Sequence, residues 1–300
     1  MAEVVKQLST LLDHGLIARL ERLRITAVGH RTARGRGEHL AGRGGASTDF
    51  VDYREYAAGD DLRYVDWNIF ARLQKPFLKQ FRREEERHLV VIVDVSRSME
   101  IEGKAFRARQ LAAAFAVAGI SGGDRVSMWS SAASGGAVLR LPPCAGRPFL
   151  RRALRAAEEI PAPAGGTTID RTVDAVMARH AGRGIAVLIS DFLGGGDVRR
   201  MLTRVAAAGL EPHVLQVLAP VELDPALSGD LRLVDSETGE ILDVSDIGDL
   251  LHLYHGQREA LQMLLSQGCT ARQGRSITVD AAADIGEFVL GTLRRRGWLA

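Results

Sequence analysis

The sequence is poor in cysteine, has no long apolar run and carries almost no net charge. Its two cysteines, Cys144 and Cys269, lie far apart and lack the paired spacing of a zinc site. A chain of 300 residues is also too long to be a small secreted domain held together by disulfides. A reducing compartment fits this cysteine usage best, so we predict a cytoplasmic protein.

Membrane and nucleic-acid functions find little support in the composition. The longest apolar stretch, LAAAFAVAGI at residues 111–120, has about half the length of a membrane span, so we expect no transmembrane segment. Asp13 and His14 interrupt the apolar residues near the N-terminus, which argues against a signal peptide. The formal net charge of +2 is small for a nucleic-acid binder, whose surface usually carries a pronounced basic patch. We therefore expect no nucleic-acid partner.

Short apolar runs alternate with helical patterns between residues 88 and 220. Three of the runs are rich in β-branched residues and lack polar alternation, as in strands buried on both faces: HLVVIVD (88–94), IAVLISD (185–191) and PHVLQVL (212–218). Shorter strand candidates are RVSMWSS and AVLRL. Helical segments separate the runs, at about 103–121, 147–160, 171–181 and 198–209. This alternation predicts an α/β fold with a doubly wound, mostly parallel sheet flanked by helices.

The flanking regions have different patterns. Residues 4–28 carry apolar residues at three- and four-residue steps and are predicted to form a helix, followed by a loop rich in glycine and arginine. Residues 49–87 mix aromatic and charged residues without a regular period, so we expect them to wrap a surface. After Pro220, LRLVDSETGEILDV predicts a β-hairpin, and helices are expected at about 247–267 and 283–296. We therefore divide the chain into residues 1–87, 88–220 and 221–300, the last packing on the core.

Three oxygen-bearing residues follow the first buried strand directly, in the D-x-S-x-S sequence formed by Asp94, Ser96 and Ser98. In an open α/β sheet, ligands bind outside the carboxyl ends of the strands. Carboxylate and hydroxyl oxygens suit Mg²⁺, Mn²⁺ or Ca²⁺ better than zinc. Asp191 also ends a buried strand, and the loop GGTT presents two threonines before a helix. The pattern predicts a divalent-cation site, although Asp and Ser after a strand also commonly cap the next helix.

These residues resemble the metal-ion-dependent adhesion site, or MIDAS, of von Willebrand factor type A domains. The resemblance implies that the first loop contributes the Asp and both Ser of the D-x-S-x-S sequence, the second loop Thr167 and the third loop Asp191. Thr168 is the alternative to its neighbour Thr167. The upstream stretch DFVDYREYAAGDDLRYVDWNIFARLQKPFLKQFRREEE resembles the signature of the DUF58 family, which couples it to a von Willebrand A-like domain with the sequence D-x-S-x-S-M. The hairpin sequence and the late RRRG resemble the same family.

The resemblance implies a protein-interaction function. It suggests a metal-dependent adaptor or co-chaperone that acts with a MoxR-type AAA+ ATPase and other von Willebrand A proteins in the maturation or remodelling of a client protein. We expect Mg²⁺ as the cation, with Mn²⁺ or Ca²⁺ as alternatives, and no catalytic residues. Few charged ligands leave such a cation under-neutralised, so a carboxylate of a protein partner is the expected further ligand. The alternative function is a metal-dependent hydrolase that uses the same crevice.

The charged and aromatic residues of the 49–87 segment have two interpretations. In one, they form an ion-pair network that pins the N-terminal segment onto the sheet domain. In the other, they form a docking surface for the ATPase. Trp67 and Arg72 would then be the anchors, because Trp and Arg dominate the energetics of protein interfaces.

Overall fold

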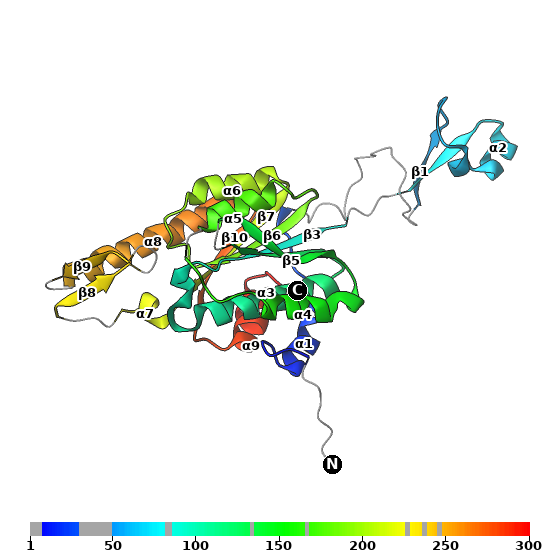
Figure 1. Ribbon diagram of the computed structural model, residues 1–300. Coiled ribbons are helices and arrows are strands. Elements are labelled where there is room, and N and C mark those ends of the chain that lie inside the picture. Colours follow the sequence, from blue (N-terminus) through cyan, green and yellow to red (C-terminus); the bar gives the residue numbers. More distant parts are fainter. Residues whose placement is uncertain are drawn as a thin grey trace, which may run out of the picture. The chain divides into compact units, whose positions relative to one another are not determined.

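Figure 1 shows a computed structural model of the chain, which divides into two compact units. The sheet unit comprises Met1–Arg31 and Glu86–Ala300, and the small unit comprises Thr32–Glu85. The residues that the structure describes are 8–29, 50–81, 86–132, 135–165, 168–225, 229–235, 239–244 and 248–300.

A six-stranded sheet forms the centre of the sheet unit. Its strands lie in the order β10-β7-β6-β3-β4-β5. The bounds are β3 His88–Val93, β4 Arg125–Ser131, β5 Ala137–Cys144, β6 Gly184–Ser190, β7 Leu210–Leu218 and β10 Arg275–Asp280. All neighbours pair in parallel except β4 and β5, which are antiparallel. Because every residue of β6 and β7 is buried, the apolar runs have the pattern of a sheet covered on both faces. The predicted doubly wound α/β fold is confirmed.

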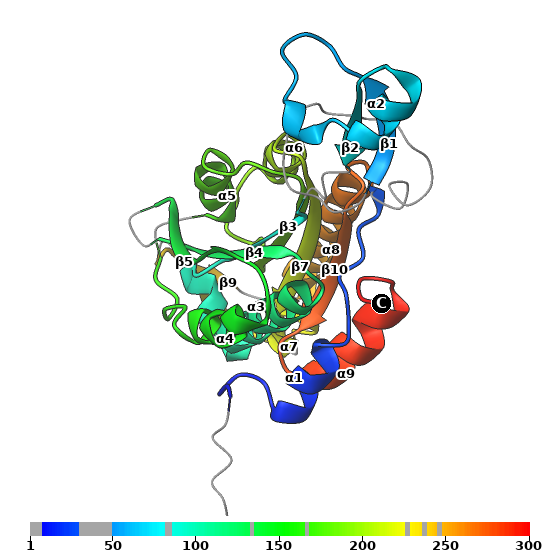
Figure 2. The same ribbon diagram turned by 90° about the vertical axis from the view of Figure 1, so that its right-hand side faces the viewer.

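Helices cover the two faces of the sheet (Figures 1 and 2). One face packs against α1 (His14–Leu20), α3 (Lys104–Ser121), α4 (Leu150–Glu158) and α9 (Ile285–Glu287) with the π-helical turn Phe288–Leu293 that follows it. The other face packs against α5 (Ile169–Met177), α6 (Val198–Ala207) and α8 (Gly248–Thr270). Alternate residues of β3 supply the two cores, with Val91 on the first face and Val90 on the second. In the described part of the chain, no helix is long and apolar enough to span a bilayer.

The N-terminal segment differs from the single long helix expected at residues 4–28. Among the residues described there, only α1 is helical, and it begins where the Asp13 side chain accepts a hydrogen bond from the Leu16 N–H at 2.9 Å. The chain then becomes extended, and Ile25 forms a β-bridge with Leu299 near the C-terminus. The expectation was wrong because Leu23, Ile25 and Ala27 are buried at every second position, the period of a strand.

The C-terminal region confirms the hairpin and adds a strand. β8 (Leu231–Val234) and β9 (Ile241–Val244) pair antiparallel. The expected helix at 283–296 is divided between α9 and the π-helical turn, which ends at Leu293. β10 was not expected, and it occupies one edge of the main sheet. A short helix, α7 (Pro220–Leu223), connects β7 to the segment that carries the hairpin.

The small unit is a hairpin with a helix between its strands. β1 (Phe50–Glu55) pairs antiparallel with β2 (Phe77–Phe81), and a 3-10 turn at Leu62–Tyr64 and α2 (Trp67–Leu73) lie between them in sequence. These elements were not expected from the sequence, which has no regular period here, because local polar contacts fix them. Asp66 caps α2 and forms an ion pair with Lys79 at 3.1 Å, and Arg54 pairs with Asp60 at 2.6 Å. These ion pairs join residues within the unit.

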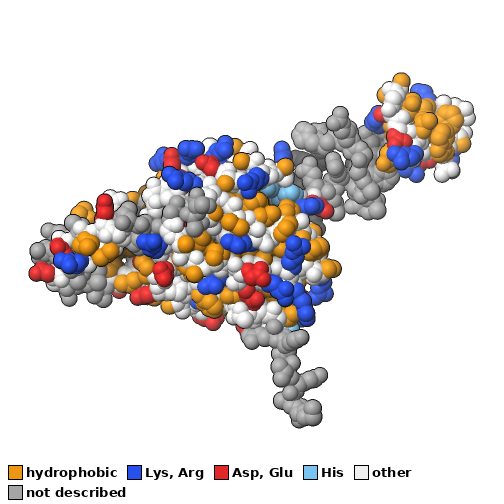
Figure 3. All heavy atoms as spheres, in the orientation of Figure 1, with side chains coloured by type: hydrophobic (Ala, Val, Ile, Leu, Met, Phe, Trp, Pro, Cys, Tyr) orange, Lys and Arg blue, Asp and Glu red, His pale blue; other side chains and the backbone are white. Residues whose placement is uncertain are grey.

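Exposed apolar side chains gather on the small unit (Figure 3). They are Tyr53, Leu62, Tyr64, Trp67 and Leu73. The Trp67 side chain is 60% exposed and packs edge-on against Phe70, with ring centroids 6.0 Å apart.

Candidate metal centre

Two carboxylates lie where neighbouring strands of the sheet end. Asp94 follows β3 and Asp191 follows β6, and these strands are adjacent and parallel. The Asp94 N–H donates to the Ile189 carbonyl oxygen at 2.9 Å, so the strand pairing continues to the first residue of the loop. The strands β4 and β5 lie on one side of this pair, and β7 and β10 lie on the other. The carboxylates are therefore at the point where the strand order reverses, which is the usual ligand site in open α/β sheets.

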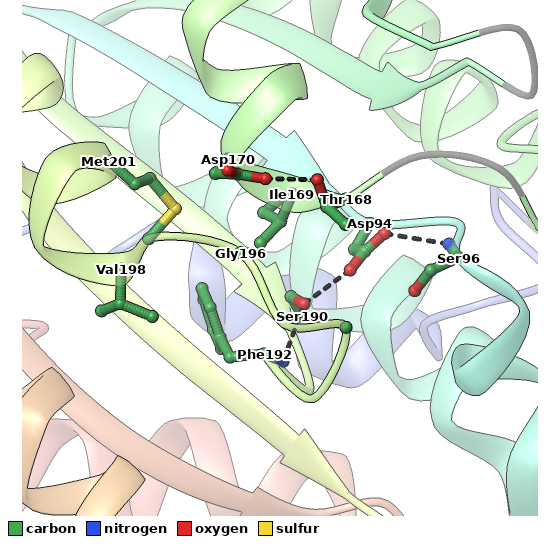
Figure 4. Close-up of a pocket in the computed structure, with 11 residues that line it drawn as sticks. Asp94, Ser96, Thr168, Ile169, Asp170, Ser190, Phe192, Gly196, Val198 and Met201 are labelled. Carbon is green, nitrogen blue, oxygen red and sulfur yellow. Dashed lines mark hydrogen bonds between the residues drawn. The ribbon is translucent and has the colours of Figure 1, made fainter. Parts of the chain in front are cut away.

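The Asp94 carboxylate is buried among neutral hydrogen-bond donors. Its residue is 4% exposed, and Oδ1 accepts a hydrogen bond from the Ser96 N–H at 2.9 Å. Oδ2 accepts one from the Ser190 hydroxyl at 2.6 Å (Figure 4). Burial raises the pKa of Asp94 to about 6, and the negative charge of Asp191 acts in the same direction. Within the described residues, no Lys or Arg forms an ion pair with this carboxylate.

The two serines of the D-x-S-x-S sequence bring their hydroxyls beside this carboxylate. Ser96 Oγ and Ser98 Oγ are 3.1 Å apart, and both residues are buried. Ser96 precedes the 3-10 turn Arg97–Gly103, but its side chain makes no capping hydrogen bond to that turn. The Ser96 hydroxyl is instead hydrogen-bonded to the Ser98 hydroxyl. Helix capping, the alternative explanation of the sequence, therefore does not account for Ser96.

The loop before α5 supplies a threonine, and the first turn of α5 supplies a further carboxylate. Thr167 lies outside the described residues, so its predicted role as a ligand stays a prediction. Thr168 lines a narrow pocket together with Asp94, Ser96 and Asp170 (Figure 4). The Thr168 hydroxyl donates to the Asp170 carboxylate. Sequence reasoning missed Asp170, which lies between the GGTT loop and the helix predicted at 171–181 and belongs to the first turn of α5.

The Asp191 carboxylate already has a cationic partner. Asp191 is fully buried, and its Oδ2 accepts a hydrogen bond from Lys104 Nζ at 2.8 Å. Its Oδ1 accepts one from the Leu193 N–H at 3.0 Å. Lys104 is also fully buried, and its ammonium group bonds to Glu222 Oε1 at 2.6 Å. Neither Lys104 nor Glu222 was predicted to belong to the site.

The residue that follows Asp191 has an unusual backbone conformation. Phe192 has a φ of +60°, in the left-handed region that side chains other than glycine seldom adopt. Its N–H donates to Ser190 Oγ at 2.9 Å, and the Asp191 carbonyl accepts from Gln216 Nε2 at 3.2 Å. Several hydrogen bonds thus hold the loop after β6 in a costly conformation, as is common at functional sites.

The donor set beside Asp94 fits a hard divalent cation. A buried carboxylate without a basic partner is costly, and a bound cation would offset that cost. The described residues contain no metal-binding group of three or more His, Cys, Asp or Glu side chains. An ion at this position would therefore depend on the hydroxyls of Ser96 and Ser98 as well as on Asp94, a donor set that suits Mg²⁺ better than zinc.

The fold and this site define a doubly wound α/β protein with a narrow crevice beside Asp94 at the strand reversal. The chain belongs to the family described as "Protein of unknown function DUF58", whose model matches residues 52–259. The uncharacterized proteins Rv1480 of Mycobacterium tuberculosis and Mb1516 of Mycobacterium bovis are each 32% identical to it over 303 residues. Each alignment covers 96% of this chain and 92% of the relative.

Two solved structures show more remote similarity. The conserved hypothetical protein BatB from Bacteroides thetaiotaomicron is 16% identical, with a TM-score of 0.44, over 70% of this chain and 98% of that protein. Proximal thread matrix protein 1 from the mussel byssus, in a structure with a zinc-occupied MIDAS motif, is 14% identical. Its TM-score is 0.33, and the match covers 44% of this chain and 38% of that protein.

Proposed function

We propose that this protein is a metal-dependent interaction adaptor. Asp94, Ser96 and Ser98 would hold Mg²⁺, and Thr167 or Thr168 and Asp191 are the further candidate ligands. The cation would supply open coordination positions and positive charge for a carboxylate of a protein partner. The proposal extends to a MoxR-type AAA+ ATPase as the partner and to the maturation or remodelling of a client protein, as the family resemblance implies.

The observation that carries this proposal is the buried Asp94 carboxylate with its two hydroxyl neighbours. The side chain accepts only neutral donors in the described structure, and it lies at the strand reversal where α/β sheets bind ligands. One carboxylate and two hydroxyls do not neutralise a divalent cation. A bound ion would retain positive charge, which favours an acidic partner group as an additional ligand.

A binding role explains the polar side chains of the pocket better than a hydrolytic one. The Asp170 carboxylate, the second acidic group of the pocket, is hydrogen-bonded by Thr168 and by the Asp197 N–H at 3.4 Å. A general base must instead reach the proton that it abstracts. Generic phosphoester and ester substrates with Mg²⁺ or Mn²⁺ provide the direct test, because a hydrolase would turn them over.

The small unit supplies a second candidate surface for a protein partner. Trp67 and Arg72 lie on α2, and both side chains are exposed. The ion pairs Arg54–Asp60 and Lys79–Asp66 join residues within the unit, so they stabilise its hairpin. We propose that the ATPase docks on α2, while the metal centre binds an acidic group of the client.

Affinity capture from the native lysate tests the proposal. The full chain serves as bait in Mg²⁺ and in EDTA, as wild type and as Asp94→Ala. Asp243→Ala is the matched control, because it removes an exposed carboxylate from β9, away from the crevice. We expect mass spectrometry to find an acidic client enriched only by wild type and control in Mg²⁺. Equal capture of every protein in EDTA would contradict a role of the metal in binding.

A further inference from the structure

Lys104 is a fully buried cation beside the candidate metal centre. It is the first residue of α3, and it follows Gly103, whose φ of +79° turns the chain into the helix. Burying an ammonium group is costly unless oxygen acceptors surround it. Lys104 Nζ meets this condition with Asp191 Oδ2 at 2.8 Å and Glu222 Oε1 at 2.6 Å.

Every oxygen of the two carboxylates that contact Lys104 accepts a hydrogen bond. Asp191 Oδ1 accepts the Leu193 N–H at 3.0 Å, and Glu222 Oε2 accepts the Ala219 N–H at 2.8 Å. The remaining oxygen of each carboxylate is bonded to the ammonium group. Asp191 is therefore committed to Lys104, whereas Asp94 on the neighbouring strand is bonded only by neutral donors.

This difference determines how many negative charges the ends of β3 and β6 offer to a metal ion. If Asp94 and Asp191 were both ligands, they would neutralise a divalent cation. Asp191 is held by Lys104. Of the two carboxylates at the strand ends, Asp94 is therefore the one that lacks a basic partner. A cation bound there keeps an excess of positive charge, which raises its attraction for a carboxylate of another protein.

We infer that Lys104 is a built-in cation that competes with the metal ion for Asp191 and so keeps the metal centre under-neutralised and selective for an acidic partner group. This inference rests on the proposed function, because it concerns the same metal centre. Lys104 acts as a positioning residue for Asp191. It lowers the affinity for the metal itself and preserves the affinity of the bound metal for a partner.

A purely structural role of Lys104 is the competing explanation. The contact with Glu222 anchors α7, and α7 also receives hydrogen bonds from α8, since the Tyr254 hydroxyl donates to the Glu222 carbonyl at 2.7 Å. A lysine with only this role would affect folding when replaced but would not change metal affinity through Asp191. The dependence of metal affinity on the Asp191 carboxylate therefore distinguishes the two roles.

The test measures Mn²⁺ binding to the full chain by electron paramagnetic resonance of the free ion. The variant Lys104→Met with Glu222→Gln removes one positive and one negative charge, so it frees Asp191 without changing the net charge of the cluster. We expect Mn²⁺ to bind at least about tenfold more tightly than in wild type, because the charge of the ligand set governs the affinity of such sites. Adding Asp191→Asn to this variant should remove the gain.

A second variant tests the inference without removing Lys104. Asp191→Asn alone should change the wild-type Mn²⁺ affinity by less than about threefold, because the lysine already withholds this carboxylate. A tenfold loss would show that Asp191 is a direct ligand beside an intact Lys104, which overturns the inference. The inference is also overturned if the folded Lys104→Met, Glu222→Gln variant binds Mn²⁺ with wild-type affinity. It is overturned as well if that variant binds Mn²⁺ more tightly and the gain in affinity remains after Asp191→Asn is added.

The same experiment separates this inference from the proposed function. If wild type binds Mn²⁺ through Asp94 but the Lys104 variant gains nothing, the metal centre stands and the role of Lys104 is refuted. If wild type and the Lys104 variant both fail to bind Mn²⁺, the metal centre itself is refuted and the inference falls with it. Circular dichroism of each variant establishes that the comparison is between folded proteins.

Discussion

Replacing Asp94 with asparagine should stabilise the metal-free protein while abolishing its metal binding. The buried carboxylate has its pKa raised from 3.8 to about 6, with burial as the main cause. The folded protein therefore binds this proton more tightly than the unfolded chain does. The free energy of unfolding must fall as the pH rises from about 4 to about 6, and the loss persists at higher pH. Asparagine carries no charge, so the free energy of unfolding of the variant does not show this fall with pH.

The expected gain in the free energy of unfolding follows from the pKa shift of Asp94. A difference of about 2 pKa units corresponds to roughly 3 kcal/mol at pH values above both pKa values. Asparagine retains an oxygen acceptor for the Ser96 N–H, but it replaces the acceptor of the Ser190 hydroxyl by an NH₂ group. The lost hydrogen bond costs about 1 kcal/mol. We therefore expect Asp94→Asn to be more stable than wild type by about 1–3 kcal/mol at pH 8 in EDTA.

Urea unfolding followed by tryptophan fluorescence measures this difference, since Trp129 and Trp298 are both buried in the sheet unit. At pH 4 the two proteins should differ by less than about 1 kcal/mol, because Asp94 is then protonated in the folded protein and nearly half protonated in the unfolded chain, so most of the pH-dependent loss is absent. Mg²⁺ at a hundredfold excess over its Kd should stabilise wild type by about 2.7 kcal/mol and leave the variant unchanged. A variant that is less stable than wild type at pH 8 would refute the reasoning.

Further substitutions test the ligands, the packing of the sheet and the small unit. Ser98→Ala should weaken Mg²⁺ binding about tenfold in calorimetry, and wild-type affinity would exclude its hydroxyl as a ligand. Gly184→Ala should cost more than about 2 kcal/mol in urea unfolding, because the added Cβ would lie 1.9 Å from the His88 carbonyl oxygen. Gly256→Ala, in α8 with open space around it, should instead stabilise the protein by up to about 1 kcal/mol; equal effects of both glycine substitutions would contradict this account. Trp67→Ala should change stability by less than about 0.5 kcal/mol yet reduce capture of the ATPase, and undiminished capture would remove α2 as its docking site.

The parts of the fold that sequence predicted are those that depend on local apolar patterns. β3 and β6 are continuous apolar runs because both of their faces are buried, and such runs are visible without knowledge of their partners. β10 and the extended N-terminal segment carry weaker patterns. Their strand structure comes from contacts with residues far away in sequence, such as the Ile25–Leu299 bridge. Short-range periodicity cannot report such pairing.

The same distinction applies to the candidate site. Asp94, Ser96 and Ser98 are neighbours in sequence, so their common location could be predicted from one motif after one strand. Lys104 and Glu222 are separated by more than a hundred residues, and nothing in the sequence of an alanine-rich helix indicates that its first lysine is buried. Their pairing depends on the way in which α3 and α7 meet in the folded protein. Charge compensation inside a core is a tertiary property that sequence motifs do not encode.

The most direct test of the account is the position of a bound cation in crystals of the full chain. Crystals grown with Mn²⁺ and measured at the manganese absorption edge give an anomalous-difference map that locates the ion without reference to the protein atoms. We predict one strong peak within about 2.2 Å of oxygen atoms of Asp94, Ser96 and Ser98, absent from Asp94→Asn crystals. A map without a peak at this crevice, or an equal peak in the variant, would contradict it.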